Sequence, residues 1–264
     1  SALDGSDGFS LVGEFAYSAL GASVSAAGDV NGDGVDDVIV GASEVDLNGE
    51  DSGASYVVFG KTAGFDAAID VSELNGTNGF RLDGVSERDY TGASVGTAGD
   101  INGDGFDDVI IGAHNANPNG NYASGASYVV FGKASGFAAA MNVSALDGSN
   151  GFRLDAVSEG DNMGASVSTA GDVNGDGFDD LIIGAPNAGP EGDRSGSSFV
   201  MFGKASGFDA AINLLSLSGP DGVRLEGVTE FDRSGASVSN AGDINKDGFD
   251  DLIVGAPGAD TNGS

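Results

Sequence analysis

Asp29-Val30-Asn31-Gly32-Asp33-Gly34-Val35-Asp36-Asp37 is the stretch of sequence that decides the fold. The same pattern of Asp, Asn and Gly returns three more times, starting at Asp100, Asp172 and Asp243, so that successive starts lie 71, 72 and 71 residues apart. A fixed period of this length is typical of an array of repeated structural units. Each unit is therefore expected to carry one such loop.

The loop has the side chains that a hard cation prefers. In its first copy Asp29, Asn31 and Asp33 offer side-chain oxygens at positions 1, 3 and 5. Val35 offers its backbone carbonyl, and Asp37 adds a carboxylate at position 9. A donor set made only of oxygen disfavours zinc, copper and iron, and it suits calcium better than magnesium. We therefore expect about four Ca²⁺ ions, one per loop. The predicted ligands are Asp29, Asn31, Asp33, Val35, Asp37, Asp100, Asn102, Asp104, Phe106, Asp108, Asp172, Asn174, Asp176, Phe178, Asp180, Asp243, Asn245, Asp247, Phe249 and Asp251.

The predicted ions are structural rather than regulatory. Asn-Gly and Asp-Gly pairs also form hairpin turns, so the loops have a simpler interpretation as turns without metal. However, two carboxylates 4 Å apart repel by about 4 kcal/mol at intermediate screening, and a loop that gathers three of them would splay without a cation. The carboxylates at position 8 are expected to cap the start of a strand or to face solvent. They are Asp36, Asp107, Asp179 and Asp250.

The second copy shows four strands within one period. Phe80 to Asp83 is a short alternating run, and Gly92 to Gly99 is made of small residues. Asp108 to Ala113 and Ala126 to Gly132 are continuous runs rich in apolar residues. Four short strands with hairpin-length connections fit one blade of a β-propeller, and no segment has a sustained helical period. The sequence predicts an all-β fold, a β-propeller of four-stranded blades, with about four blades in this chain and one calcium loop per blade.

The chain is predicted to be one domain, residues 1–264, built as a single array. Its repeats are expected at residues 8–78, 79–150, 151–221 and 222–264, the last of them incomplete. One outer strand, three sets of four and a final pair give roughly 15 strands. Four blades are few for a propeller, so three arrangements remain open. These are a small ring, ring completion by self-association, and ring completion by the rest of a longer chain.

The composition excludes several classes of partner. The chain has 41 acidic and 10 basic residues, and its net charge of −31 would repel nucleic acid and anionic lipid. It has no Cys, which excludes disulfides and thiolate metal sites, and no apolar run approaches the ~20 residues of a membrane span. Ser1 to Gly5 lacks a basic segment, so no signal peptide is expected. We expect an extracellular or cell-surface protein with no nucleic-acid partner and no membrane insertion.

One motif suggests catalysis, but the repeats explain it. Gly92-Ala93-Ser94-Val95-Gly96 matches the pattern of a nucleophile elbow, and His114 is the only His. The elbow requires a strand followed directly by a helix, and no helix is predicted after Ser94. The other copies read Gly-Ala-Ser-Val-Ser here, so Ser94 is assigned to an inner strand. His114 replaces the Pro of two other copies and is expected to be exposed. The protein is predicted not to be an enzyme.

Basic residues that recur in every unit are expected to pair between blades. They are Arg81, Arg153, Arg224, Lys61, Lys133 and Lys204. Loops that vary between units are better candidates for binding a partner. These candidates are Glu87 to Asp89 with its counterparts at Glu159 and Glu230, Asn117 to Tyr122, and Glu191 to Arg194.

With these motifs in place, the chain resembles the FG-GAP repeat family, the propeller units of integrin alpha chains and of many bacterial surface proteins. The resemblance rests on the four loops and on Gly184-Ala185-Pro186 and Gly255-Ala256-Pro257, and it spans nearly the whole chain. The Phe of the Phe-Gly element is replaced in each copy, and this departure favours the bacterial branch. The replacements are Leu20, Thr91, Met163 and Ser234.

The resemblance implies calcium between the first two strands of each blade and a role in extracellular adhesion or recognition. The leading hypothesis is therefore a calcium-binding, non-catalytic recognition or adhesion module whose ligand is an extracellular protein or glycan. Two alternatives stay open. One is a structural spacer of a giant secreted bacterial protein, and the other is an accessory domain of a secreted hydrolase.

Overall fold

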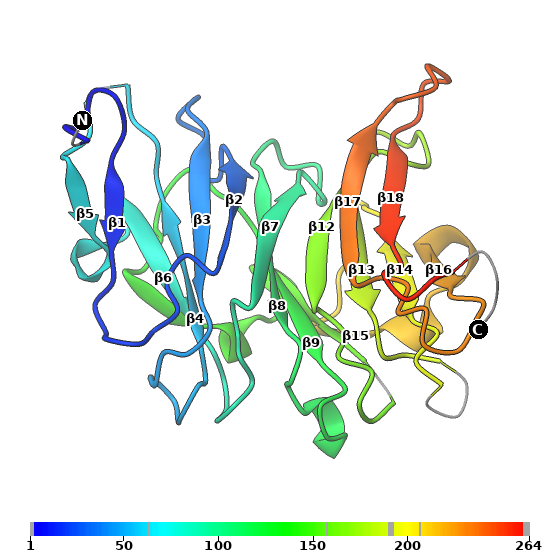
Figure 1. Cartoon of the computed structure of the whole chain (residues 1–264). Coiled ribbons are helices and arrows are strands. Elements are labelled where there is room, and N and C mark those ends of the chain that lie inside the picture. The colour runs from blue at the N-terminus through cyan, green and yellow to red at the C-terminus, as the bar shows by residue number, and fades with distance from the viewer. Residues whose placement is uncertain (1–2, 63, 157, 190–192, 206, 261–264) are drawn as a thin grey trace.

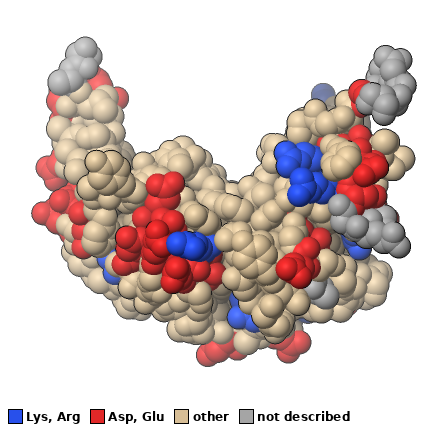
Figure 2. All heavy atoms as spheres, turned by 60° about the horizontal axis from the view of Figure 1, so that its bottom comes forward, with Lys and Arg blue, Asp and Glu red and all other residues tan. Residues whose placement is uncertain are grey.

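Short antiparallel strands recur in the same order along a computed structural model of the chain. The structure describes residues 3–62, 64–156, 158–189, 193–205 and 207–260. Successive β-sheets stand side by side and form an open crescent whose two arms carry the N- and C-terminal parts of the chain (Figures 1 and 2). This is the predicted all-β propeller array, and the described residues leave it open between the two arms.

Four of the described sheets are built outward from an inner strand, and in each of them the loop pattern lies between the first two strands. The inner strands are β2 (Ser23–Gly28), β7 (Ser94–Gly99), β12 (Ser166–Gly171) and β17 (Ser237–Gly242). The second strands are β3 (Asp37–Ala42), β8 (Asp108–Ala113), β13 (Asp180–Ala185) and β18 (Asp251–Gly255). The third strands are β4 (Ala54–Val58), β9 (Ala126–Val130) and β14 (Ser197–Met201). The outer strands are β1 (Ser10–Val12), β6 (Gly79–Asp83), β11 (Gly151–Asp155) and β16 (Gly222–Glu226).

Three further strands were not predicted, and they add a fifth strand to two of the sheets. They are β5 (Ala68–Asp70), β10 (Ala140–Asn142) and β15 (Ala211–Asn213). Each pairs in parallel with the outer strand that comes before it in the chain: β5 with β1, β10 with β6 and β15 with β11. The prediction of four-stranded blades is therefore incomplete, because three-residue strands in long-range parallel pairs leave little local signal.

A short 3₁₀ turn follows each of these three strands. The turns are η1 (Val71–Glu73), η3 (Val143–Ala145) and η5 (Leu214–Ser216). The side chain before each turn caps it, as when the Asp70 carboxylate accepts a hydrogen bond of 2.9 Å from the Ser72 N–H. Two other turns, η2 (Pro118–Gly120) and η6 (Gly219–Asp221), lie in loops. These short turns are the helical segments of the described residues.

Aromatic rings fill the space between neighbouring sheets. The ring of Phe80, on β6, stacks on Phe137, between β9 and β10, with centroids 4.6 Å apart, and Phe59 meets both rings edge-on. The same trio returns one unit later, with Phe152 stacked on Phe208 at 4.6 Å. Phe80 and Phe152 are almost fully buried, and each is covered by its stacked partner ring.

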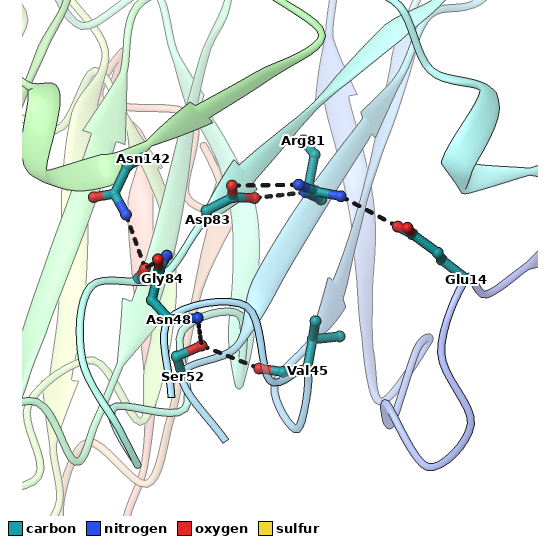
Figure 3. Close-up of polar contacts among 8 residues, drawn as sticks. All are labelled: Glu14, Val45, Asn48, Ser52, Arg81, Asp83, Gly84 and Asn142. Carbon is teal, nitrogen blue, oxygen red and sulfur yellow. Dashed lines mark hydrogen bonds and ion pairs between the residues drawn. The ribbon is translucent and has the colours of Figure 1, made fainter. Parts of the chain in front are cut away.

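The prediction that the recurring Arg side chains pair between blades is wrong for two of the three. Arg153 binds Asp155 and Arg224 binds Glu226, each two residues further along the same strand. Residues two apart on a strand share one face of the sheet, which explains the pairing. Arg81 pairs in the same way with Asp83 at 2.6 Å and also reaches Glu14, beyond β1, at 3.2 Å (Figure 3).

The recurring Lys side chains do not pair with carboxylates of a neighbouring blade among the described residues. Each ammonium lies over the ring of a Phe four residues later, as Lys133 does over Phe137 at 4.9 Å. The backbone of these lysines does cross between sheets, because the Lys133 N–H donates to the Val30 carbonyl at 2.9 Å and the Lys204 N–H donates to the Ile101 carbonyl at 3.0 Å. The Lys stem and ring therefore pack together, and the main chain makes the link.

Candidate metal loops

In each of the four loops, side-chain oxygens accept hydrogen bonds from backbone N–H groups of the same loop. In the first loop the Asp29 carboxylate accepts hydrogen bonds from the N–H groups of Asp33 (3.0 Å) and Gly34 (2.8 Å). The Asp33 carboxylate accepts from the Val35 N–H at 2.9 Å. Gly34 has φ of +84°, a conformation that favours glycine and turns the chain sharply. The second, third and fourth loops repeat this pattern, so in each loop the side-chain oxygens at positions 1 and 3 both accept a hydrogen bond from the position 5 N–H.

The carboxylate at position 9 is buried in three of the loops. Asp37, Asp108 and Asp180 are at most 1% exposed. Each accepts a hydrogen bond from the backbone of the Phe-Gly segment after the third strand, as Asp37 does from the Gly60 N–H at 2.8 Å. Burial raises the pKa of these carboxyls to about 6 for Asp37, about 7 for Asp180 and about 8 for Asp108, and the Asp side chains at positions 1 and 5 add to the rise. The fold thus places a costly negative charge next to other negative charges.

The second oxygen of the position 9 carboxylate has different surroundings in the second loop. In the first and third loops the second oxygen of the position 9 carboxylate accepts from a backbone N–H, such as that of Val30 at 3.0 Å. The Oδ2 atom of Asp108 is buried and makes no hydrogen bond of ordinary geometry among the described residues, although the Ile101 N–H lies close enough to lower the pKa of this carboxyl. An all-oxygen donor set that includes a buried carboxylate fits a hard cation.

The acidic side chains alone do not make a metal site. Within the part of the chain that the structure describes, no three Asp, Glu or His side chains converge closely enough to hold a metal ion. A cation in these loops would therefore also need the Asn side chain at position 3, the backbone carbonyl at position 7, and water. These are the additional donors that the sequence pattern predicts.

The expectation for position 8 is wrong in three loops. The Asp107 carboxylate accepts a hydrogen bond of 2.7 Å from the N–H of Asp29, the first residue of the preceding loop. Asp179 accepts from Asp100 and Asp250 accepts from Asp172 in the same way, at 2.9 and 3.0 Å. Only Asp36 is exposed, as expected. These carboxylates are connectors that join one loop to the next.

One sequence signal for these connectors was missed. A Gly stands directly before position 1 in every copy, and a Cβ on Gly28 would lie 2.2 Å from the Asp107 carboxylate. A second close approach lies beside it, because a Cβ on Gly32, at position 4, would lie 2.2 Å from the Phe106 ring. The loops therefore form a continuous chain of contacts across neighbouring sheets.

The structure does not support the motif that suggested catalysis. Ser94 lies in β7, and its hydroxyl donates a hydrogen bond of 2.7 Å to the Gly164 carbonyl of the next sheet. No helix follows it. His114 is half-buried rather than exposed, because its ring stacks at 5.7 Å on Tyr90, in the connection between β6 and β7. Burial lowers the pKa of His114.

The loops proposed for partner binding lie at the opposite ends of the strands from the metal loops. Arg88 forms an ion pair of 2.5 Å with Glu50, and Tyr122 is 66% exposed. Nearby, the Gly84 carbonyl accepts hydrogen bonds from the side chains of Asn48 (2.8 Å) and Asn142 (3.1 Å) (Figure 3). Glu191, at the start of the third predicted loop, lies outside the described residues.

Asp89, in one of these loops, gives a pH prediction. It is 3% exposed, and burial raises its pKa from 3.8 to about 6. The folded chain therefore holds this proton more tightly than the unfolded chain, and stability falls as the pH rises from about 4 through 6. Since each pKa unit corresponds to about 1.4 kcal/mol, Asp89→Asn should raise the unfolding free energy by about 1–2 kcal/mol at pH 8. Urea unfolding at pH 4 and 8 checks this, and an equal gain at both pH values contradicts it.

The segments of the chain that match a known family recur at the same spacing as the loops. The FG-GAP repeat model matches residues 20–58, 91–130, 163–201 and 234–264. The chain belongs to the FG-GAP repeat family. Each of the first three matches contains the inner strand, the metal loop and the next two strands of one sheet. The FG-GAP unit therefore coincides with the part of the sheet that carries the predicted ligands.

The FG-GAP chain is also similar to integrin alpha chains of animals. It is 32% identical over 254 residues to integrin alpha-V of Gallus gallus, covering 94% of this chain and 21% of that protein. It is 30% identical over 197 residues to integrin alpha-5 of Xenopus laevis, covering 72% of this chain and 17% of that protein. The chain thus spans about a fifth of the relatives that it matches. These matches do not support the expected bacterial branch. The described residues include no helix that could cross a membrane.

Proposed function

We propose that this FG-GAP chain is a calcium-binding, non-catalytic recognition or adhesion module that acts outside the cell, with about four structural Ca²⁺ ions. The observation that carries the proposal is the set of buried carboxylates at position 9, Asp37, Asp108 and Asp180. A divalent cation would neutralise these charges where burial makes them costly. The likeness to integrin alpha chains supports the extracellular role.

The residues proposed to hold the ions are the five donors per loop that the sequence predicts. Within the first loop, Asp29 and Asp33 are already oriented by backbone N–H groups, so the loop is preorganised. The Asp37 carboxylate is fixed by the Gly60 N–H at the start of β3. Bound calcium would supply positive charge and coordination. The chain's own contribution is to hold these oxygens near one another and to connect each loop to the next through position 8.

The proposed partner is an extracellular protein or glycan, and the proposed contact surface is the set of loops opposite the metal loops. This surface offers exposed aromatic and charged side chains, including Tyr122 and the Arg88–Glu50 pair. A protein and glycan array probed in calcium tests it. Binding that is lost on Tyr122→Ser supports the surface, whereas no binding to any array member favours a structural spacer.

Calorimetric titration tests the metal assignment loop by loop. The calcium-free chain should bind about four Ca²⁺. Asp104→Ala removes a position 5 donor from the second loop and should reduce the number by one, with the other three sites nearly unchanged. Asp66→Ala is the matched control, because Asp66 is an exposed Asp outside the loops. An undiminished count in Asp104→Ala, or no calcium binding at all, would overturn the assignment.

A further inference from the structure

Two cavities of the same construction lie at the ends of the strands opposite the metal loops. One has a volume of about 130 Å³, and the residues that line it include Ser86, Asp89, Asn117, Tyr128 and Arg153. The other lies one unit later and has a volume of about 360 Å³. At the corresponding positions it is lined by Ser158, Asp161, Gly189, Phe199 and Arg224. We call them the Asp89 cavity and the Asp161 cavity. Their recurrence in two successive units indicates that the repeat itself builds them.

One wall of each cavity combines an aromatic ring with a guanidinium group. Tyr128 on β9 and Arg153 on β11 lie directly opposite each other in an antiparallel pair, as do Phe199 on β14 and Arg224 on β16. Residues opposite each other in such a pair present their side chains on the same face of the sheet. The Arg224 guanidinium lies over the Phe199 ring, 5.5 Å from its centroid. This wall therefore offers hydrogen-bond donors next to an apolar surface.

A second wall of each cavity carries a carboxylate. Asp89 and Asp161 lie in the connections that lead to the inner strands β7 and β12, and each accepts a hydrogen bond from the N–H of a Ser three residues before it. Burial raises the pKa of Asp161, and the nearby Arg224 guanidinium partly offsets this rise. Among the described ion pairs Arg224 binds Glu226 at 3.4 Å and not Asp161. The cavity therefore separates a hydrogen-bond acceptor from a donor of opposite charge.

The first unit shows the closed alternative. Ser18 stands where the two later units have Asp89 and Asp161. Arg81, the counterpart of Arg224, is bound there by Glu14 at 3.2 Å, an acid in the connection that leads to β2 (Figure 3). The fold can thus join this Arg directly to an acid of that connection. The later units have a cavity in place of the ion pair.

Volume and exposure favour the Asp161 cavity as a binding site. Pockets for small molecules have volumes of about 300–1,000 Å³, a range that includes the Asp161 cavity but not the Asp89 cavity. Asp161 is half-buried, so a ligand can reach its carboxylate, whereas Asp89 is 3% exposed. Leu215 also lines the Asp161 cavity and is 49% exposed. The larger cavity therefore combines reachable polar groups with apolar surface.

The side chains of the Asp161 cavity match a hydroxyl group better than an ion. An anion would be repelled by Asp161 and Glu226, and a cation would be repelled by Arg224 and leave its N–H groups unused. A hydroxyl group can donate a hydrogen bond to a carboxylate and accept one from a guanidinium. Phe199 and Leu215 supply apolar contacts for the carbon atoms that carry such hydroxyls. A ring with several neighbouring hydroxyl groups satisfies all of these side chains.

We infer that the Asp161 cavity binds one sugar unit of a neutral glycan. The inference rests on the proposed recognition function and names the class of ligand for its loop surface. One sugar hydroxyl donates a hydrogen bond to the Asp161 carboxylate, and a neighbouring oxygen accepts one from the Arg224 guanidinium. The carbon atoms of the sugar ring lie against Phe199 and Leu215.

NMR titration of the ¹⁵N-labelled full chain in calcium tests the inference, with the methyl glycosides of glucose, galactose and mannose as probes. The Ser158 N–H donates to Asp161, so its amide signal reports on the cavity directly. At least one of the three sugars should shift this signal in a saturable way. Asp161→Asn keeps an oxygen for the Ser158 N–H but loses the charge, and Arg224→Gln loses the guanidinium. Each variant should bind the sugar about fivefold more weakly or worse, because hydrogen bonds to charged groups are the strong ones.

Controls separate the cavity from general effects. Asp66→Asn changes an exposed Asp outside both cavities and should bind the sugar like the original chain. Circular dichroism and a melting curve verify that each variant is folded. Methylammonium and acetate, the charged probes, should shift the Ser158 signal less than the sugar does at the same concentration.

Three results overturn the inference: no shift with any of the sugars, a larger shift with either ion, or full sugar binding by both cavity variants. A protein from the array that shifts the same signals without any sugar response also overturns it, and assigns the cavity to a protein. The calcium count is measured on the same sample. Calcium binding without a sugar response rejects the glycan site alone, whereas a sugar response without calcium binding rejects the metal assignment alone.

Discussion

Removal of divalent cations with EDTA should lower the melting temperature by tens of degrees. At a calcium concentration 100 times the dissociation constant, each site stabilises the folded chain by about 2.7 kcal/mol, so four sites give about 11 kcal/mol. This is as large as the whole net stability of a typical domain. For a chain of this size, 1 kcal/mol shifts the melting temperature by about 2–4 °C, so a fall of about 20–40 °C is expected.

Differential scanning calorimetry with and without calcium measures this effect. Excess calcium added back to the EDTA-treated chain should restore the original transition, which separates metal loss from irreversible damage. Magnesium at the same concentration should restore less, because it demands a stricter octahedron and gives up water reluctantly. An EDTA-treated chain that melts at the original temperature would show that the buried carboxylates are held without a cation.

Asp107→Ala should destabilise the calcium-loaded chain by about 2–3 kcal/mol. The Asp107 carboxylate accepts the Asp29 N–H at 2.7 Å across the boundary between two sheets, and its removal leaves a half-buried N–H unpaired. Hydrogen bonds to charged groups are worth about 1.5–3 kcal/mol, and an orphaned donor adds its desolvation cost. Urea unfolding measures the loss, and calcium titration should show weaker binding at the first loop, because its first residue loses an anchor.

Asp107→Asn is the matched variant, since its amide oxygen can still accept the same hydrogen bond. It should retain at least half of the stability that Asp107→Ala loses. Equal losses in both variants would mean that the negative charge, rather than the contact between loops, matters. No loss in either would refute the role of position 8 as a connector.

Most of the fold prediction rests on the repeated loops. Loops at intervals of 71 or 72 residues, with small inner strands before them and apolar strands after them, place the four main strands correctly in the three sheets that contain β2, β7 and β12. The strand positions follow from short local sequence patterns, such as the apolar run of the six-residue strand Asp108–Ala113. The short strands β5, β10 and β15 were not predicted because parallel pairing with an earlier outer strand is a long-range event.

Contacts within each loop follow from the local sequence, whereas contacts between loops do not, and metal binding by the predicted donors stays a prediction. The side-chain oxygens at positions 1 and 3 both accept from the position 5 N–H because the local turn brings them there. The role of Asp107 depends on a neighbour 78 residues away, and its own loop contains no sign of it. His114 was expected to be exposed because the Tyr90 ring that covers it lies in the connection between β6 and β7, away from it in the sequence.

The parallel pairs β1–β5, β6–β10 and β11–β15 have a mechanical consequence. In each pair the earlier strand and the later strand run in the same direction, joined by bonds such as that from the Arg81 N–H to the Ala139 carbonyl. Tension applied to the two ends of the chain would pull the paired strands in opposite directions along their axes. The hydrogen bonds of a pair would then be loaded in shear. They would resist the force together, instead of breaking one after another.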